Sequence, residues 1–212
     1  GQATSLVKLL NQRTRQVDVA PSRLRTSSTG VLSRKERLTD ARLVPVDKES
    51  SAPVATVIFP SDHGVDLPLF SPALRANLTA LQLEWEHAEE IEAAGMHPTL
   101  SCLIYGPPGT GKTTLALWLA RELDKPVVLA RIDGLISSFL GTTARNLSNL
   151  FAFANRYDCV LVLDEFDAIA KVRDDPNEVG EIKRVVNALL QNMDERSRHG
   201  ITIGITNLED FL

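Results

Sequence analysis

Cysteine, histidine and the aromatic residues are scarce in this chain of 212 residues. The two cysteines, Cys102 and Cys159, lie in separate apolar strand candidates. We therefore expect buried free thiols in a reducing cytosol and no disulfide. The four histidines show no metal-ligand spacing, so the sequence gives no reason to predict a histidine metal site.

Long hydrophobic runs are also missing. No apolar run approaches the roughly 20 residues that a membrane-spanning helix needs. The chain also has no apolar segment typical of a secretory leader. These absences predict a cytoplasmic protein with no membrane partner. Hydrophobic residues still make up 43% of the chain, which is enough for a globular core.

Charge is distributed unevenly, although the net charge is only −4. Residues 1–50 hold ten Lys and Arg against five Asp and Glu, whereas residues 51–212 hold thirteen against twenty-two. The basic part is weakly patterned, apart from a short amphipathic helix candidate from Val7 to Val17. Its composition favours a solvated arm, and contact with an acidic partner such as nucleic acid stays open. We assign residues 1–53 to a poorly structured basic arm or linker and residues 54–212 to the folded domain.

A helix candidate begins at Ser71, where a serine cap is followed by Pro72 at the first helical position. Apolar residues then recur at spacings of three and four as far as Ile91. Gly95 and Pro98 end this pattern. The segment predicts one amphipathic helix packed on the domain.

Strand and helix candidates alternate through the rest of the chain. Short apolar runs predict strands, and a period of 3.6 residues predicts helices. Strands are expected over residues 54–59, 100–105, 127–132, 159–163 and 201–206, and helices over residues 112–123, 143–155 and 181–193. The alternation predicts an α/β fold with a parallel sheet and helices on both faces. Ligands of such sheets bind at the carboxyl ends of the strands.

A complete phosphate-binding pattern, G-x-x-x-x-G-K-[ST], follows the strand at 100–105 and opens the next helix. Glycines let the backbone approach phosphate oxygens, and the amides of the loop form an anion-binding nest. Lys112 is expected to reach the β- and γ-phosphates, and the Thr113 hydroxyl to complete a Mg²⁺ shell. The strand before and the helix after disfavour a plain Gly/Pro turn. The predicted nucleotide site comprises Gly106, Pro107, Pro108, Gly109, Thr110, Gly111, Lys112, Thr113 and Thr114.

Polar residues end two further strands at the expected ligand edge. Asp164 and Glu165 follow a buried strand, so Asp164 can support the Mg²⁺ shell while Glu165 activates a water for attack on the γ-phosphate. An acid pair leaving a core strand is the structural alternative, which the complete phosphate loop disfavours. Asn207, after the last strand, can read the γ-phosphate or the attacking water through its amide, although a strand-to-loop Asn is common.

Three segments together resemble the ATPase core of the AAA family: GPPGTGKT (106–113), VLVLDEFDAIA (160–170) and GITN (204–207). The resemblance covers roughly residues 60–212. It implies that the first segment is the Walker A loop, that Asp164 and Glu165 are the Walker B acids, and that Asn207 is the sensor-1 residue. It also implies ATP and Mg²⁺ as cofactors, a homo-oligomeric and usually hexameric ring, and a protein substrate or effector partner. The family fold separates the strands of the two cysteines by the strand at 201–206.

A further correspondence lies in Phe139, Leu140 and Gly141, which precede the helix at 143–155. Many AAA unfoldases carry an aromatic–aliphatic–Gly loop here that grips polypeptide in the axial pore. An exposed aromatic ring on a Gly-flanked loop offers apolar grip without a demand for sequence. The resemblance therefore implies a gripping loop, while a core position for Phe139 is the alternative.

The chain also departs from the family pattern. It stops at Leu212, so the arginine finger, the fifth strand and the helical lid of family members lie beyond it. Without them we expect this fragment to bind nucleotide poorly and to hydrolyse it slowly. Asp194-Glu195 also stands where some close relatives have Asp-Gly, which puts signalling between subunits through this loop in doubt.

The function that these features predict is Mg²⁺-dependent ATP hydrolysis by a ring-forming ATPase that remodels, unfolds or translocates a protein. Two alternatives stay open at this point. One is a DNA-acting loader that uses the basic arm, and the other is a nucleotide-gated switch whose hydrolysis only resets a complex.

Overall fold

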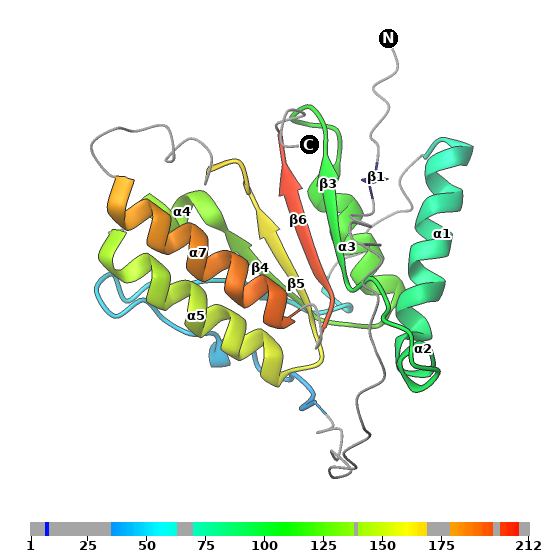
Figure 1. Ribbon diagram of the computed structural model, residues 1–212, viewed down its shortest axis with the longest axis horizontal. Helices are drawn as coiled ribbons and strands as arrows, with labels where there is room; N and C mark the ends of the chain where they lie inside the picture. Colours follow the sequence, from blue (N-terminus) through cyan, green and yellow to red (C-terminus); the bar gives the residue numbers. More distant parts are fainter. Residues whose placement is uncertain are drawn as a thin grey trace, which may run out of the picture.

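The computed structural model describes residues 7–8, 35–62, 70–137, 140–168, 179–196 and 200–207. Within them, one six-stranded sheet forms the centre of the molecule (Figure 1). Its strands are β1 (Val7–Lys8), β2 (Thr56–Ile58), β3 (Ser101–Tyr105), β4 (Val127–Arg131), β5 (Val160–Asp164) and β6 (Thr202–Thr206).

The strand order is β1-β3-β6-β5-β4-β2. The four central strands run parallel, and the short outer strands β1 and β2 pair antiparallel with β3 and β4. This confirms the predicted parallel α/β sheet. It also places β6 between the strands of Cys102 and Cys159, which are free and buried as expected.

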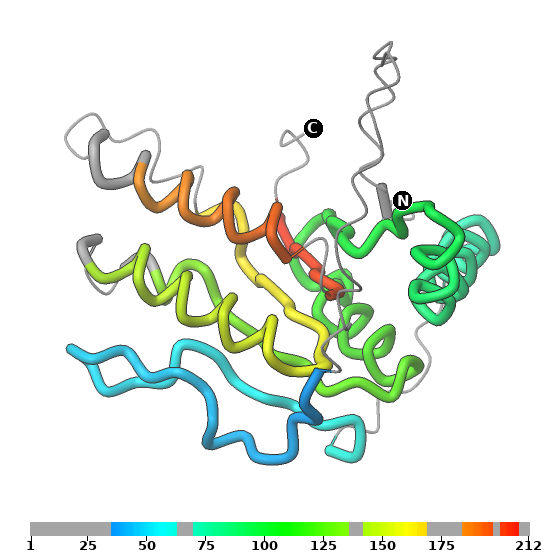
Figure 2. The backbone as a smooth tube through the Cα atoms, turned by 60° about the horizontal axis from the view of Figure 1, so that its bottom comes forward, coloured from blue at the N-terminus to red at the C-terminus, as the bar shows by residue number. Residues whose placement is uncertain are grey.

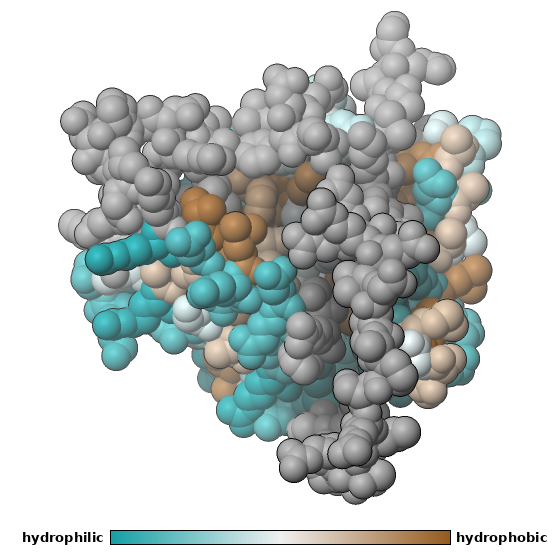
Figure 3. Space-filling model, viewed as in Figure 1, coloured by the Kyte–Doolittle hydropathy of each residue, from teal (hydrophilic) through white to brown (hydrophobic). Residues whose placement is uncertain are grey.

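Helices cover both faces of the sheet, as the alternating pattern predicts (Figure 1). On one face lie α4 (Ile132–Ser137), α5 (Leu140–Arg156) and α7 (Val179–Arg196). On the other lie α1 (Pro72–Glu86), α2 (Ala88–Ala93) and α3 (Lys112–Glu122). The outward faces of α5 and α7 carry mostly hydrophilic residues in the view of Figure 3, so their apolar sides face the sheet.

Two helices differ from the prediction. The single helix expected from Ser71 to Gly95 is interrupted at His87, which ends α1 and precedes α2. Its start is confirmed, since the Ser71 side chain accepts a hydrogen bond from Leu74 N and Pro72 is the first helical residue. Helix α4 was not expected, because six residues directly after a strand are too few to show a helical period.

Residues 35–53, assigned above to the basic arm, belong to the packed structure. Leu38 and Val44 are buried in the same core cluster as Val54 and the inner side of α5. Glu36 donates its backbone N–H to Arg156 and accepts one from Asp158, with distances of 3.1 and 2.9 Å. Figure 2 shows this segment running beside α5. The prediction was wrong here because its few apolar residues follow no regular period, so their burial leaves no pattern in the sequence.

A buried carboxylate fastens this segment to α5. Asp47 accepts hydrogen bonds from the backbone N–H groups of Glu49 and Ser50, both at 2.8 Å, and from the Asn146 side chain. These hydrogen bonds lower the pKa of Asp47 to about 2. Hydrogen bonds donated to a carboxylate favour its charged form over its protonated form.

The arm itself lies largely outside the described residues. Its predicted helix over Val7 to Val17 is wrong at the two residues that the structure describes there, which form β1. The domain boundary at residue 54 therefore does not mark where packing begins, since the described chain is already in the core cluster at Leu38.

Candidate functional site

The carboxyl ends of the four parallel strands meet at one edge of the sheet, where the sequence places its motifs. Arg131 is paired in register with Asp164 across β4 and β5, and Tyr105 with Thr206 across β3 and β6. The residues that follow these strand ends, including Gly106, are therefore brought side by side. This is the ligand edge expected of an open parallel sheet.

The phosphate loop connects β3 to α3, and its glycines take conformations that other residues rarely adopt. Gly109 has φ 76° and Gly111 has φ 84°, which is the left-handed region. Gly111 also stands at the N-cap of α3 without a side chain to cap the helix. The first backbone N–H groups of α3 therefore stay available for an anionic ligand. Pro107, Pro108, Thr110 and Thr114 are exposed around this loop.

Lys112 folds back onto the loop that carries it. Its Nζ donates hydrogen bonds to the carbonyl oxygens of Gly106 and Pro107, both at 2.8 Å. The side chain is only 7% exposed. Burial lowers the pKa of Lys112, while the charges of Asp164 and Asp167 act in the opposite direction. The ammonium thus occupies a retracted position, from which a phosphate would have to draw it.

Thr113 and Asp164 are in direct contact across the edge. The Thr113 hydroxyl donates to Oδ2 of Asp164 at 3.0 Å, although the two residues are 51 positions apart in the sequence. The other oxygen of Asp164 accepts the backbone N–H of Glu165 at 2.8 Å. A hydroxyl and a carboxylate oxygen side by side are the hard ligands that Mg²⁺ prefers, with waters completing its shell. These residues fit a magnesium site of the predicted composition.

Glu165 is held by two residues that sequence reasoning missed. Arg131 Nη2 donates to its Oε1 at 2.9 Å and to Asp133 Oδ2 at 3.3 Å. The hydrogen bond with the Asp133 side chain raises the pKa of Glu165 and lowers that of Asp133. Glu165 also has a left-handed backbone with φ 56°, which is uncommon outside glycine. In this state the side chain of Glu165 is turned toward Arg131 and Asp133.

A simple signal could have identified Arg131 and Asp133. Both lie at the end of the predicted strand 127–132, on the same edge as the other strand-end residues. Polar residues at these strand ends are ligand candidates, as Asp164, Glu165 and Asn207 are. Arg131 and Asp133 belong to no phosphate-binding motif, so the sequence pattern does not single them out.

Asp167 is a further charged residue at this edge that the sequence reasoning left aside. It is only 3% exposed, one turn beyond β5. The turn is fixed by two backbone hydrogen bonds, from Phe166 N to Ile205 O at 2.9 Å and from Ala168 N to Glu165 O at 3.0 Å. The negative charge of Asp167 raises the pKa of Lys112, against the larger effect of burial.

For the other predicted residues, Asn207, Leu140 and Gly141, the structure gives the position along the chain but no side-chain contact. Asn207 directly follows β6 at the same edge and is exposed. Leu140 and Gly141 form the first turn of α5, while Phe139 lies outside the described residues. The predicted gripping loop therefore stays a prediction.

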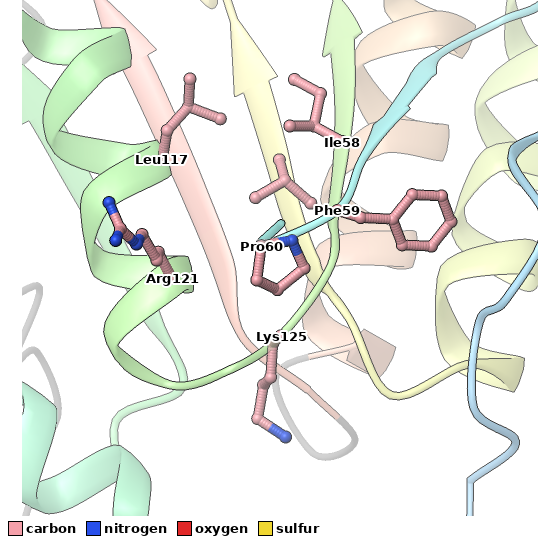
Figure 4. Close-up of a pocket in the computed structure, with 7 residues that line it drawn as sticks. Ile58, Phe59, Pro60, Leu117, Arg121 and Lys125 are labelled. Carbon is pink, nitrogen blue, oxygen red and sulfur yellow. The ribbon is translucent and has the colours of Figure 1, made fainter. Parts of the chain in front are cut away.

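A small pocket lies away from this site, toward the opposite end of α3 (Figure 4). It is lined by Ile58, Phe59, Pro60, Leu117, Arg121, Lys125 and Val127. Val127 begins β4, so the pocket is at the amino end of the strands and takes no part in the nucleotide edge. Within the described ranges, no three His, Cys, Asp or Glu side chains are grouped to hold a metal, and no helix is long and apolar enough to cross a membrane.

Comparison with known proteins agrees with the resemblance to the AAA family that the motifs at this edge suggest. The family model described as "ATPase family associated with various cellular activities (AAA)" matches residues 102–212. The chain is 41% identical over 172 residues to the uncharacterized AAA family ATPase y4kL of Sinorhizobium fredii, covering 81% of this chain and 52% of that protein. It is 33% identical over 183 residues to the peroxisomal ATPase pex6 of Schizosaccharomyces pombe, covering 84% of this chain and 19% of that protein.

A third relative is the proteasome-activating nucleotidase 2 of Halobacterium salinarum, with 31% identity over 179 residues, 82% of this chain and 42% of that protein. The chain thus spans about half or less of the length of these relatives. Because the family model covers more than half of the chain, this protein belongs to the AAA family of P-loop ATPases.

Proposed function

We propose that this chain is the Mg²⁺-ATP-hydrolysing core of a ring-forming AAA ATPase that unfolds, remodels or translocates a protein substrate. The observation that carries the proposal is the 3.0 Å contact between the Thr113 hydroxyl and the Asp164 carboxylate. It joins the phosphate loop to the strand that presents Glu165, which supports a site where the predicted phosphate, metal and water-activating residues act together.

Each residue has a role that follows from its chemistry. The loop amides from Gly106 to Thr113 and the Lys112 ammonium hold the phosphates, and Thr113 with Asp164 holds Mg²⁺. The bound metal would neutralise charge on the β- and γ-phosphate oxygens. Glu165 takes a proton from the attacking water, and the Asn207 amide orients that water or the γ-phosphate.

Glu165 has to leave its present partners before it can act as a base. Its Oε1 accepts a hydrogen bond from Arg131, and its carboxyl is hydrogen-bonded to Asp133. A general base must be within hydrogen-bond reach of the water that it deprotonates, and a carboxylate turned toward Arg131 and Asp133 is occupied elsewhere. We infer that nucleotide binding releases Glu165 from Arg131 and Asp133.

The protein substrate and the ring are supported by the relatives and by the loop sequence. One relative is named a proteasome-activating nucleotidase. The segment Phe139-Leu140-Gly141 has the aromatic–aliphatic–Gly order of such gripping loops, and Leu140 and Gly141 begin α5. The hexamer and this gripping role are proposals, as is a basic arm that precedes the packed segment beginning at residue 35.

The central test is Glu165→Gln, measured as ATP binding and ATP turnover by the ring-forming protein. The amide keeps the size of the side chain but cannot accept the proton, so turnover should fall at least about a hundredfold while ATP binding persists. Glu122→Gln, at the end of α3, is a matched control on an exposed glutamate and should retain turnover. Unchanged turnover in Glu165→Gln would remove Glu165 from the mechanism.

The charge distribution favours a second candidate, a DNA-acting loader that uses the basic residues of the first 50 positions. DNA binding that weakens steeply with salt and disappears when residues 1–34 are removed would support the loader. Loss of protein processing in Phe139→Ala, with ATPase activity retained, would support the translocase. If neither change has an effect, the nucleotide-gated switch gains support.

A further inference from the structure

Two cationic side chains, Lys35 and Arg196, come together beside Gly200. Nζ of Lys35 lies 2.7 Å from the point where a Cβ on Gly200 would stand, and Nη1 and Nη2 of Arg196 each lie 3.1 Å from the same point. Since both groups are so close to one point, they are within about 6 Å of each other, a distance at which like charges repel. Arg196 ends α7, so this junction lies at the end of the sheet opposite the nucleotide edge.

No carboxylate neutralises these two cations in the part of the chain that the structure describes, where no ion pair includes either of them. Two acidic residues of the same region have other partners. Glu36 pairs with Arg156 at 3.0 Å, and Asp158 pairs with Lys125 at 2.6 Å. The positive charge beside Gly200 is therefore left without a counter-charge in direct contact.

The guanidinium of Arg196 is fully buried, and its hydrogen-bond acceptors are uncharged. Its Nη atoms donate to three backbone carbonyl oxygens and to the side-chain oxygen of Asn155, while its Nε has no acceptor among the described residues. A buried charge without an opposite charge is costly. Burial and the charge of Arg196 also lower the pKa of Lys35 to about 8. An anion at this point would relieve both effects.

The glycine at position 200 is explained by space and not by its backbone. Its φ lies outside the left-handed region, so other residues could adopt the same conformation. A side chain there would instead project onto the two cations. Gly200 and Lys35 are both partly exposed, so this side of the junction is open to solvent.

We propose that Lys35 and Arg196 form a binding site for a small oxyanion of the phosphate type, on the side of Gly200 where the side chain is missing. An ammonium and a guanidinium are the groups with which proteins hold such anions. The ligand is small, because even one added carbon atom at Gly200 would collide with Lys35. The site is separate from the nucleotide edge and does not depend on the proposed function.

The first test measures the reactivity of the Lys35 amine, with inorganic phosphate as the probe. The protein is treated with acetic anhydride at pH 8, and acetylation of each lysine is followed by mass spectrometry. A bound phosphate favours the charged ammonium and so raises the pKa of Lys35. A tenfold tighter hold on the proton would slow acetylation about fivefold at this pH, so we expect at least about threefold slowing in about 20 mM phosphate. Chloride at equal ionic strength is the reference, and the exposed Lys48 should change less than about 1.5-fold.

The second test fills the space beside the cations. Gly200→Ala puts a Cβ 2.7 Å from the ammonium of Lys35, which displaces it, so the slowing by phosphate should disappear. Gly134→Ala is the matched control, because an added Cβ there meets no atom within 4 Å, and it should keep the slowing.

A third measurement does not depend on the Gly200 variant. The rise in unfolding temperature with phosphate is measured in a Lys112→Met background, which weakens binding of phosphate to the loop of the nucleotide site. Lys35→Gln should reduce this rise by about half or more, since it removes one of the two cations. Lys48→Gln removes an exposed lysine of the same segment and should leave the rise unchanged.

The outcomes separate the site from general effects of charge. Acetylation of Lys35 that phosphate does not slow, or that it slows no more than for Lys48, would overturn the proposal. Full slowing in Gly200→Ala would also overturn it, because the anion would then bind elsewhere. If Gly200→Ala does not fold, the thermal comparison decides: an unchanged rise in Lys35→Gln overturns the site, and a halved rise supports it.

Discussion

At the scale of single residues, the phosphate loop depends on backbone conformations that side chains disfavour. Gly111 has φ 84°, and an added Cβ would meet no atom within 4 Å. Space is therefore not the reason for glycine at this position. The left-handed backbone is the reason, since it carries a penalty for every residue with a Cβ.

Gly111→Ala isolates that penalty. We expect it to destabilise the protein by roughly 1–2 kcal/mol, the cost of a left-handed conformation at a residue with a Cβ. Urea unfolding monitored by circular dichroism measures the change. Gly134→Ala is the matched control, since Gly134 lies in α4, has no neighbouring atom within 4 Å and no left-handed φ. It should leave stability unchanged or raise it by about 0.5–1 kcal/mol. Equal losses in both variants would rule out backbone strain as the cause.

At the same scale, the residues at the strand ends differ in how clearly the sequence marks them. Asp164, Glu165 and Lys112 are candidates from the sequence because fixed motifs name them. Arg131 and Asp133 lie at the same edge, but arginine and aspartate at strand ends are common. Only the pairing of β4 with β5 brings Arg131 next to Asp164 in register and within reach of Glu165.

At the scale of elements, two buried polar side chains join segments that are distant in sequence. Asp47 holds the segment of residues 35–62 against α5. Arg196, at the end of α7, donates to the carbonyl oxygens of Ala154, Cys159 and Ile201 at 2.6, 2.9 and 3.2 Å. Its guanidinium thus joins α5, α7 and the starts of β5 and β6 at the end of the sheet opposite the nucleotide edge.

The Asp47 contact predicts sensitivity to acid. The pKa of Asp47 is lowered from 3.8 to about 2 in the folded protein, so the folded state binds the proton less readily than the unfolded chain. Its contribution to stability is therefore complete above pH 4 and is lost as the pH falls toward 2. Urea midpoints at pH 7, 4 and 2.5 should show this loss. Asp47→Ala should lower the midpoint at pH 7 and flatten the decline below pH 4. A decline as steep as in the unaltered protein would assign the acid sensitivity to other carboxylates.

Arg196→Met tests the hydrogen bonds by which Arg196 joins α5, α7 and the starts of β5 and β6. Methionine approximates the volume of the aliphatic part but removes the three hydrogen bonds from the charged guanidinium, although Ile201 O still accepts the backbone N–H of Leu161. At about 1 kcal/mol for each lost hydrogen bond, we expect a loss of about 3 kcal/mol in the free energy of unfolding. Arg145→Met, on the exposed side of α5, should change stability by less than about 0.5 kcal/mol. If both variants lose the same amount, the buried hydrogen bonds of Arg196 are not what matters.

At the scale of the whole molecule, the nucleotide edge joins both helical layers. Lys112 and Thr113 come from α3 on one face, whereas Asp133 belongs to α4 on the other, and the sheet ends lie between them. A ligand held by this edge therefore contacts residues that come together only in the folded chain. Binding should consequently stabilise the complete fold.

The expected result is a rise in unfolding temperature with Mg²⁺ and ATP. At a free ligand concentration a hundred times the dissociation constant, the gain is about 2.7 kcal/mol. Differential scanning fluorimetry over a range of ATP concentrations measures it. Lys112→Ala should abolish most of the rise, and AMP, which lacks the β- and γ-phosphates, should produce little. A rise that persists in Lys112→Ala would move nucleotide binding to another surface.

The sequence alone determined the class of the fold and the family, and it predicted the candidate phosphate and metal residues. Those signals are local: a period of two or 3.6 residues, or a motif whose members are neighbours in the chain. The tertiary structure decided that Lys112 rests on its own loop, that Arg131 and Asp133 hold Glu165, and that residues 35–53 pack on α5. These contacts join residues whose separation follows no period, such as Asp47 with Asn146, so the pairing becomes visible only when the sheet and its two helical layers are assembled.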